Sequence, residues 1–138
     1  MTLNNVSFGR NIFCGPSSIS AITGVNTDIA EQVIQDITGQ RRNVKGVYLT
    51  DLCEAFRRLK YKTTYLTHLN NSGTLFYILT VLDDGKYIIC VPNHFITIEV
   101  EGKNRYICDN HTKRPINVCG SARLSQRVIN VVRVDKME

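Results

Sequence analysis

Residues 86–109 read KYIICVPNHFITIEVEGKNRYICD, and this stretch decides the fold class. It predicts three strands, at 86–91, 94–100 and 105–109, because β-branched and aromatic residues fill runs that turn residues separate. Glu101 to Asn104 is a good hairpin connection between the last two runs. We therefore expect an antiparallel sheet here, which a further strand at 128–134 closes.

The chain before this stretch predicts mostly helices, because apolar residues recur there at helical spacing. A strand at 61–66 is the exception, and residues 111–127 look irregular. Helices that come first and an antiparallel sheet that comes second are typical of an α+β fold. The expected helices run from Cys14 to Gly24, from the capping residues Thr27 and Asp28 to Gly39, from the capping residue Thr50 to Leu59, and from the capping residue Ser72 to Leu82.

The composition is that of a globular protein, with 138 residues of which 43% are hydrophobic and 21% charged. This length suits a single domain covering 1–138. No apolar stretch approaches the roughly 18 residues of a membrane span, and the polar first five residues form no secretory signal, so we expect a cytoplasmic protein. Five cysteines, an odd number, argue against a disulfide scaffold and leave at least one free thiol.

Cys14 is the cysteine with the most informative surroundings. Gly15 and Pro16 follow it, and proline is tolerated in a first helical turn because its missing N–H would have no helical partner. The free N–H groups and the dipole of a helix N-terminus stabilise a thiolate, which is the nucleophilic form. Backbone N–H groups there also suit an oxyanion, and Gly15 leaves room for a substrate backbone. A small buried residue is the alternative interpretation of Cys14.

His94 begins a predicted strand and has a carboxylate at a defined spacing. A two- or four-residue loop centred on residues 102–103 places Asp109 on the same sheet face as His94, opposite or one diagonal step away. A three-residue loop would bring Asn110 to that face instead. Either side chain would orient the imidazole through its second ring nitrogen. The candidate catalytic residues are therefore Cys14, His94 and Asp109, with Asn110 as the alternative orienting residue.

Residues 11–18, NIFCGPSS, resemble the nucleophile segment of papain-like cysteine peptidases. The nearest branch is the compact one that includes the double-glycine-leader (bacteriocin-processing) peptidases. In that branch too an N-terminal Cys begins a helix, and His and Asp or Asn follow on strands, as His94 and Asp109 do here. Residues 10–16 also resemble the R-N-x-x-C-G-P opening of short proteins that tailed phages encode. The resemblance implies a papain-like α+β fold, with N-terminal helices packed on a C-terminal antiparallel sheet.

The resemblance implies a cysteine-dependent hydrolase, a peptidase or amidase with a peptide or protein substrate and no cofactor or metal. Cys14 would attack as the thiolate and form a thioester acyl-enzyme, His94 would move the proton, and Asp109 would hold the imidazole. A deamidase or an acyltransferase would use the same groups, because the triad fixes the acyl-enzyme step and not the acceptor.

One position departs from the papain-like pattern. Such enzymes usually place a Gln six positions before the nucleophile to complete the oxyanion hole, and here that position is Phe8. We expect Asn11 to donate instead, together with the backbone N–H of Cys14. The alternative is a slow or inactive papain-like protein, phage-encoded, that binds and modulates a host protein in the host cytoplasm. The net charge of +5 would then favour an acidic partner.

Two other interpretations rest on residue type. Cys90, Cys108, Cys119 and the nearby histidines have the donor atoms of a tetrahedral zinc site, but none of their spacings is the Cys-x₂-Cys of familiar structural sites. The basic residues at 41–45 and 113–127 would bind phosphates in a nucleic-acid-binding domain. An aromatic content of 8% without a stacking motif argues against that domain.

Overall fold

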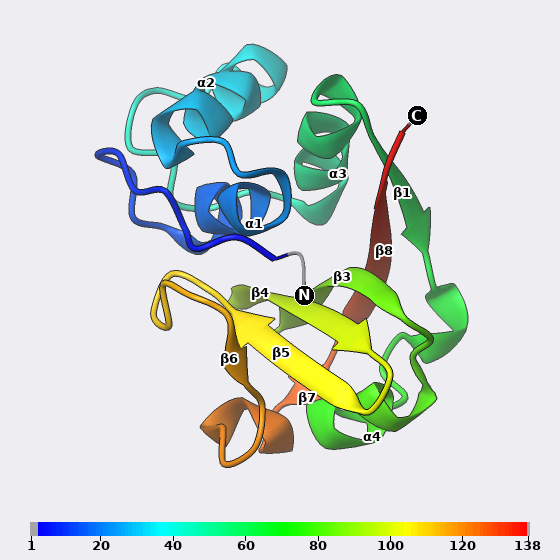
Figure 1. Ribbon diagram of the computed structural model, residues 1–138. Coiled ribbons are helices and arrows are strands. Elements are labelled where there is room, and N and C mark those ends of the chain that lie inside the picture. The colour runs from blue at the N-terminus through cyan, green and yellow to red at the C-terminus, as the bar shows by residue number, and fades with distance from the viewer. Residues whose placement is uncertain (1–2, 138) are drawn as a thin grey trace.

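The computed structural model describes residues 3–137 and has an α+β architecture (Figure 1). Helices α1, α2 and α3 cover one face of a six-stranded antiparallel sheet, and the short helix α4 lies against the other face. The elements are α1 (Cys14–Thr23), α2 (Thr27–Thr38), α3 (Leu49–Arg58), β1 (Tyr61–Tyr65), β2 (Gly73–Thr74), α4 (Leu75–Val81), β3 (Gly85–Val91), β4 (His94–Glu101), β5 (Asn104–Cys108), β6 (Ile116–Asn117), β7 (Arg127–Val128) and β8 (Asn130–Lys136), with 3-10 turns η1 (Thr67–Leu69) and η2 (Ala122–Ser125).

The sheet has the strand order β1-β8-β3-β4-β5-β6, and β2 pairs with β7 in a separate two-stranded ribbon. Strand β3 is buried on both faces, because helices cover both sides of the sheet. Its Ile88 belongs to the core beneath α1–α3, and Tyr87 and Ile89 belong to the core around α4. This double burial explains the nearly continuous apolar run at 87–91, since a strand exposed on one face would alternate with polar residues.

Two short turns set the register of the central strands. Val91 pairs with His94 across the first turn, where Asn93 has φ 59°. The loop between β4 and β5 consists of Gly102 and Lys103, and its register pairs Thr97 with Cys108. This is the two-residue loop that the sequence predicts, and the left-handed φ of 59° at Gly102 suits the tight connection.

The helix positions agree with the sequence, but three of the expected caps are wrong. Asn26 caps α2 by accepting from the N–H of Asp28, so Thr27 and Asp28 already lie in the helix. Helix α3 begins at Leu49 without a side-chain cap, and Thr50 is its second residue. Thr74 rather than Ser72 caps α4. For α2 and α4 the true cap lies within two residues of the expected one, because only the exact chain direction decides which polar side chain reaches the free N–H groups.

The core face of helix α2 contains polar as well as aliphatic residues, and Val33 and Ile37 are partly buried against the same core. Its buried residues are Thr27, Ala30, Glu31 and Ile34, whereas Ile29 is exposed. A carboxylate on the buried face is costly unless donors satisfy it, which makes Glu31 a residue to account for.

No helix within residues 3–137 has the length and hydropathy to cross a membrane.

Candidate active site

Cys14 is the first residue of α1 and lies beside the turn of the β3–β4 hairpin. Phe13 precedes the helix in an extended conformation and offers no side-chain cap, so the first-turn N–H groups are not taken up by it. The sequence suggested that Gly15 leaves room for a substrate backbone, but the space above it is filled. A Cβ at Gly15 would lie 3.1 Å from Cγ2 of Val47. The segment 40–48 therefore packs directly against the first turn of α1.

The thiol of Cys14 differs electrostatically from the three buried thiols. Burial raises the pKa of Cys53, Cys90 and Cys108, to about 12 for Cys90 and about 11 for Cys108. Burial acts in the same direction on Cys14, but hydrogen bonding from His94 and from the backbone N–H of Phe95 outweighs it and lowers the Cys14 pKa below the usual 9.0. The thiolate of Cys14 is thus stabilised.

His94 and Asp109 form a short contact at the same end of the sheet. The Nε2 atom of His94 lies 2.9 Å from Oδ2 of Asp109. Because Thr97 pairs with Cys108, Asp109 continues the register one diagonal step from His94, as the hairpin arithmetic predicts. With Nε2 bonded to the carboxylate, Nδ1 is the ring nitrogen that can exchange a proton with the thiol.

The two groups shift each other's titration. Burial would lower the His94 pKa, but the hydrogen bonds to Asp109 and Cys14 outweigh it, so the pKa lies above the usual 6.5. Burial would raise the Asp109 pKa, but His94 and the N–H groups of Thr112 and His111 bring it down to about 2. A lowered pKa of the Cys14 thiol and a raised pKa of the His94 imidazole favour a thiolate–imidazolium pair near neutral pH.

Two further side chains contact this group, and sequence reasoning missed both. Nη2 of Arg123, from η2, lies 3.4 Å from Oδ2 of Asp109. The His111 ring packs against the His94 ring with centroids 5.5 Å apart. His111 follows Asp109 by two residues, which was a signal of proximity. Arg123 lies in the irregular segment, and nothing local pointed to its contact.

Asn11 does not take the position expected of an oxyanion donor. It is 1% exposed, and its Nδ2 donates both to Oε2 of Glu31 and to the carbonyl of Val44. Its Oδ1 accepts from the N–H of Phe13. Both amide hydrogens are therefore used, and Asn11 instead fastens the segment before Cys14 to α2 and to segment 40–48. Phe8 packs against the core beneath the helices.

Asn110 also points elsewhere than to His94. Its Nδ2 donates to the carbonyl of Ile12, 3.1 Å away, so it links the end of β5 to the segment before α1. Asp109 takes the position beside the imidazole, because the β4–β5 loop has two residues rather than three.

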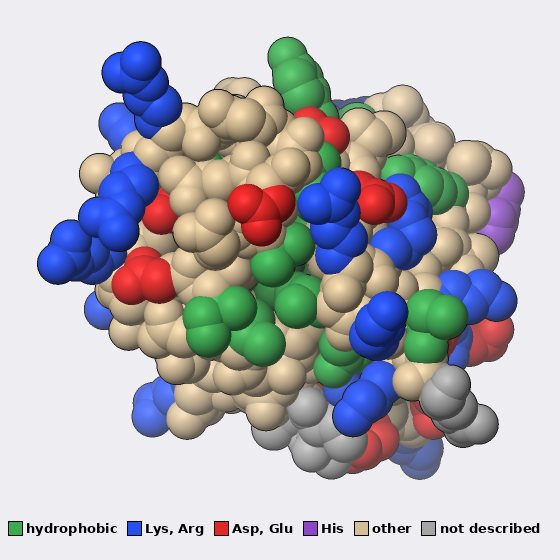
Figure 2. Space-filling view, turned by 90° about the horizontal axis from the view of Figure 1, so that it is seen from above, with side chains coloured by type: hydrophobic (Ala, Val, Ile, Leu, Met, Phe, Trp, Pro, Cys, Tyr) green, Lys and Arg blue, Asp and Glu red, His purple; other side chains and the backbone are tan. Residues whose placement is uncertain are grey.

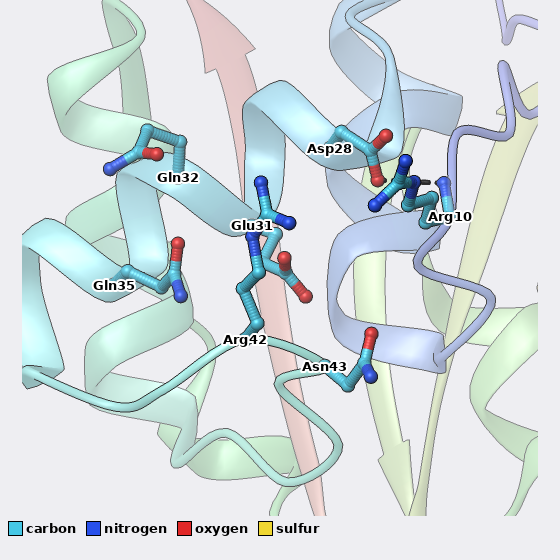
Figure 3. A pocket seen from close by; sticks show the side chains of 7 residues that line it. All are labelled: Arg10, Asp28, Glu31, Gln32, Gln35, Arg42 and Asn43. Atoms are coloured by element: carbon cyan, nitrogen blue, oxygen red, sulfur yellow. Dashed lines mark hydrogen bonds between the residues drawn. The ribbon is translucent and has the colours of Figure 1, made fainter.

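A polar cavity of about 410 Å³ lies behind the nucleophile segment (Figure 3). Asp28 and Glu31 of α2 face Arg10 and Asn43 across it, and Oδ1 of Asp28 accepts from the N–H groups of Arg10 and Asn11. The cavity contains no cysteine or histidine in its lining. Its walls are the groups that hold the chain just before Cys14.

The zinc interpretation is wrong for the part of the chain that is described. Among residues 3–137 no three His, Cys, Asp or Glu side chains come together in a way that could hold a metal ion. Cys90 and Cys108 are buried and Cys119 is exposed, with all of the cysteines free. Cys53 and Cys90 belong to the buried core.

Comparison with known proteins identifies the fold. No family model matches the chain, and no curated protein matches it by sequence. Among solved structures, a double glycine motif protease from an AMS/PCAT transporter, in complex with the leader peptide, superposes with a TM-score of 0.62 at 17% identity, over 99% of this chain and 96% of that one. The chain has the papain-like fold of the double-glycine motif peptidases.

A second solved structure agrees. The peptidase domain of Streptococcus ComA, a bi-functional ABC transporter involved in a quorum sensing pathway, gives a TM-score of 0.62 at 14% identity, over 99% of this chain and all of that domain. The α+β prediction, with N-terminal helices packed on an antiparallel sheet, is confirmed. Both neighbours are cysteine peptidase domains, so the fold is peptidase-like.

Proposed function

We propose that this protein is a cysteine-dependent hydrolase that cleaves a peptide or amide bond. The observation that supports this most is that Cys14 and His94 line one cavity while Asp109 bonds the His94 ring at 2.9 Å. The thiol has a lowered pKa beside a histidine with a raised pKa, and a buried carboxylate holds the other ring nitrogen. Nucleophilic catalysis by cysteine needs these three roles.

In the proposed reaction the Cys14 thiolate attacks the carbonyl carbon of the scissile bond and forms a tetrahedral intermediate. The imidazolium of His94 gives its proton to the leaving amine, the C–N bond breaks, and a thioester remains on Sγ. His94 then takes a proton from water, whose hydroxyl attacks the thioester and releases the acid and the thiolate. Asp109 keeps the ring in the tautomer that has Nδ1 facing the sulfur.

The proposed oxyanion site consists of backbone N–H groups at the start of α1. No side-chain amide takes part, since Phe8 stands where the family has Gln and the Asn11 amide is bonded to Glu31 and Val44. Loss of one such donor costs about a hundredfold or more in kcat. Turnover is therefore expected to be slow compared with papain-like enzymes that have the Gln.

The proposed substrate is a peptide. One structural neighbour is a protease in complex with a leader peptide, which supports a peptide as the molecule that this fold presents to its cysteine. Deamidation and acyl transfer use the same acyl-enzyme and differ only in the acceptor, so hydrolysis by water is the simplest form of the proposal.

Alkylation of the thiol tests the proposal without knowledge of the substrate. Cys14 is expected to react with iodoacetamide at pH 6 to 7 at least about tenfold faster than exposed Cys119, because its thiolate persists to lower pH. The fast phase should disappear in Cys14→Ala and slow in His94→Ala, whereas Cys119→Ser serves as the matched control and should keep it. Equal rates at the two cysteines would contradict the proposal.

A second candidate function is binding of a peptide or an acidic host protein without turnover. Two observations favour it: Phe8 stands where papain-like enzymes have Gln, and the Asn11 amide already donates to Glu31. It predicts that wild type and Cys14→Ala bind peptides equally and that neither cleaves them. A nucleic-acid-binding function gains no support from the helix face, where Lys and Arg side chains are spread out with Asp and Glu between them (Figure 2).

A further inference from the structure

A cavity of about 310 Å³ opens beside Cys14, between segment 40–48 and the turn of the β3–β4 hairpin. Its volume suits one or two amino-acid side chains rather than a large ligand. Much of its wall is apolar, from the hairpin and from Val47. The lining residues are Cys14, Lys45, Gly46, Val47, Cys90, Val91, Asn93, His94 and Phe95.

The charge of this cavity is one-sided. Lys45 contributes a permanent positive charge, and the raised pKa of His94 favours a second one. No carboxylate is among the residues that line it. Asp109 lies behind the His94 ring, 1% exposed, and is neutralised by His94 and Arg123. The Cys14 thiolate is the negative group in the lining and is paired with His94, so the charge of Lys45 remains to attract an anionic group.

The ammonium group of Lys45 is available to a ligand. Its contact with the protein is over the ring of Phe13, with Nζ 5.7 Å from the centroid. No carboxylate lies within ion-pair distance of it in residues 3–137. An exposed cation–π contact contributes about 0.5–1 kcal/mol, so a carboxylate can displace or share it. Phe13 immediately precedes Cys14, which keeps the cation near the nucleophile.

The backbone beside Lys45 is fixed relative to Cys14. The N–H of Val44 donates to Oε2 of Glu31, 3.0 Å away, and the Val44 carbonyl accepts from Nδ2 of Asn11 at 3.0 Å. Asn11 lies in the segment that leads into α1, so these hydrogen bonds hold the Lys45 side of the cavity against the segment that carries Cys14. Lys45 is thus presented from an anchored position, although its own side chain reaches solvent.

We propose that Lys45 makes this cavity a subsite for an acidic side chain of the substrate, next to the bond that Cys14 attacks. The substrate class is then a peptide with Asp or Glu beside the scissile bond, and the apolar wall contacts the methylene groups of that side chain. This inference rests on the proposed function for its substrate, but the charge preference of the cavity is measurable without turnover.

The test compares two alkylating reagents of similar size, iodoacetate, which is negatively charged, and iodoacetamide, which is neutral. In both reactions Cys14 Sγ bonds to the CH₂ carbon as the C–I bond breaks and iodide leaves. The ratio of the two rate constants cancels the intrinsic reactivity of the thiol. Lys45→Glu is expected to lower the ratio of iodoacetate to iodoacetamide at least about fivefold, and Lys45→Gln by less. The difference should shrink as salt is raised from about 0.05 M to about 0.5 M.

Lys103→Glu is the matched control, since it changes the same charge on the exposed β4–β5 turn and should leave the ratio unchanged. An unchanged ratio in Lys45→Glu would overturn the inference. If Cys14 is alkylated fast but the reagent ratio does not depend on residue 45, the proposed function stands without the subsite. If Cys14 is alkylated slowly but the ratio still depends on the charge of residue 45, the function is refuted and the subsite is supported.

A peptide arm then identifies the substrate class. Matched fluorogenic peptides with Glu or Gln on either side of the scissile bond should show a Glu preference of about tenfold in kcat/KM, which Lys45→Glu reverses. If Lys45→Gln slowed all peptides equally, Lys45 would act on the oxyanion and the acidic subsite would be refuted.

Discussion

Two buried carboxylates flank the nucleophile segment, and they differ in the groups that donate hydrogen bonds to them. Asp109, 1% exposed, contacts the imidazole of His94 and the guanidinium of Arg123, both of which carry or gain charge. Glu31, 8% exposed, accepts from the neutral amide of Asn11 and the backbone N–H of Val44. One carboxylate is bonded to a side chain that titrates, and the other joins segments of chain that are distant in sequence.

Hydrogen bonds to a titrating side chain and hydrogen bonds to neutral backbone or amide groups have different consequences. A carboxylate whose partner titrates changes the proton affinity of that partner, so its loss should appear in rates and pH profiles. A carboxylate whose partners do not titrate stabilises a geometry, so its loss should appear first in unfolding free energy. The following predictions test the division, from the largest effect to the smallest.

Replacement of Asp109 by Asn should reduce kcat/KM for a peptide substrate by about 10³- to 10⁴-fold. The amide keeps an acceptor for the N–H groups of His111 and Thr112, which bond Oδ1 at 2.8 Å, so the fold should persist by circular dichroism. It removes the charge that raises the His94 pKa and permits the wrong tautomer. A loss below about tenfold would contradict the assignment of Asp109 as the positioning carboxylate.

Replacement of Glu31 by Ala should lower the free energy of unfolding by about 1–3 kcal/mol for each of the two donors it abandons. Urea denaturation measures this directly. Glu31→Gln is the matched control, because it retains an acceptor oxygen and should lose less. The pH limits of activity should stay in place in both variants; a displaced limb would mean that Glu31 is coupled to the site after all.

Acid should distinguish wild type from Asp109→Asn. The Asp109 pKa of about 2 lies below its ordinary 3.8, so its stabilising effect is present above pH 3.8 and is lost as the pH falls through about 2. The difference corresponds to about 2 kcal/mol of unfolding free energy. Chemical denaturation at pH 5 and pH 2 should show this additional loss in wild type and in Glu31→Gln but not in Asp109→Asn.

Arg123→Gln should have the smallest effect, about a few-fold on kcat/KM near neutral pH. The charge of Arg123 lowers the His94 pKa, so its removal should move the alkaline limb of the pH–rate profile to higher pH. Arg127→Gln, on the neighbouring exposed strand β7, is the control and should leave the limb unchanged. A limb that moved toward acid would show that Arg123 acts mainly by holding Asp109.

The part of this comparison that involves Asp109 could be predicted from the sequence, whereas the part that involves Glu31 could not. Strand alternation and a two-residue turn determine where Asp109 lies relative to His94, because both residues belong to one hairpin. Glu31 and Asn11 are 20 residues apart and meet only through helix packing. Arg123 reaches Asp109 from an irregular segment whose path no local pattern encodes. The sequence therefore predicts the local pair but not the contacts that join separate elements.

The position of β8 has a consequence for the order in which the sheet can assemble. This last strand lies between β1 and β3, and it is the strand that joins them in the sheet. During synthesis the β3–β4–β5 hairpins can pair early, but β1 and the α3 helix that leads into it have no sheet to join until residues 130–136 emerge from the ribosome. The pairing of His94 with Asp109 is local to the β4–β5 hairpin, whereas β1 is held in the sheet by residues 130–136.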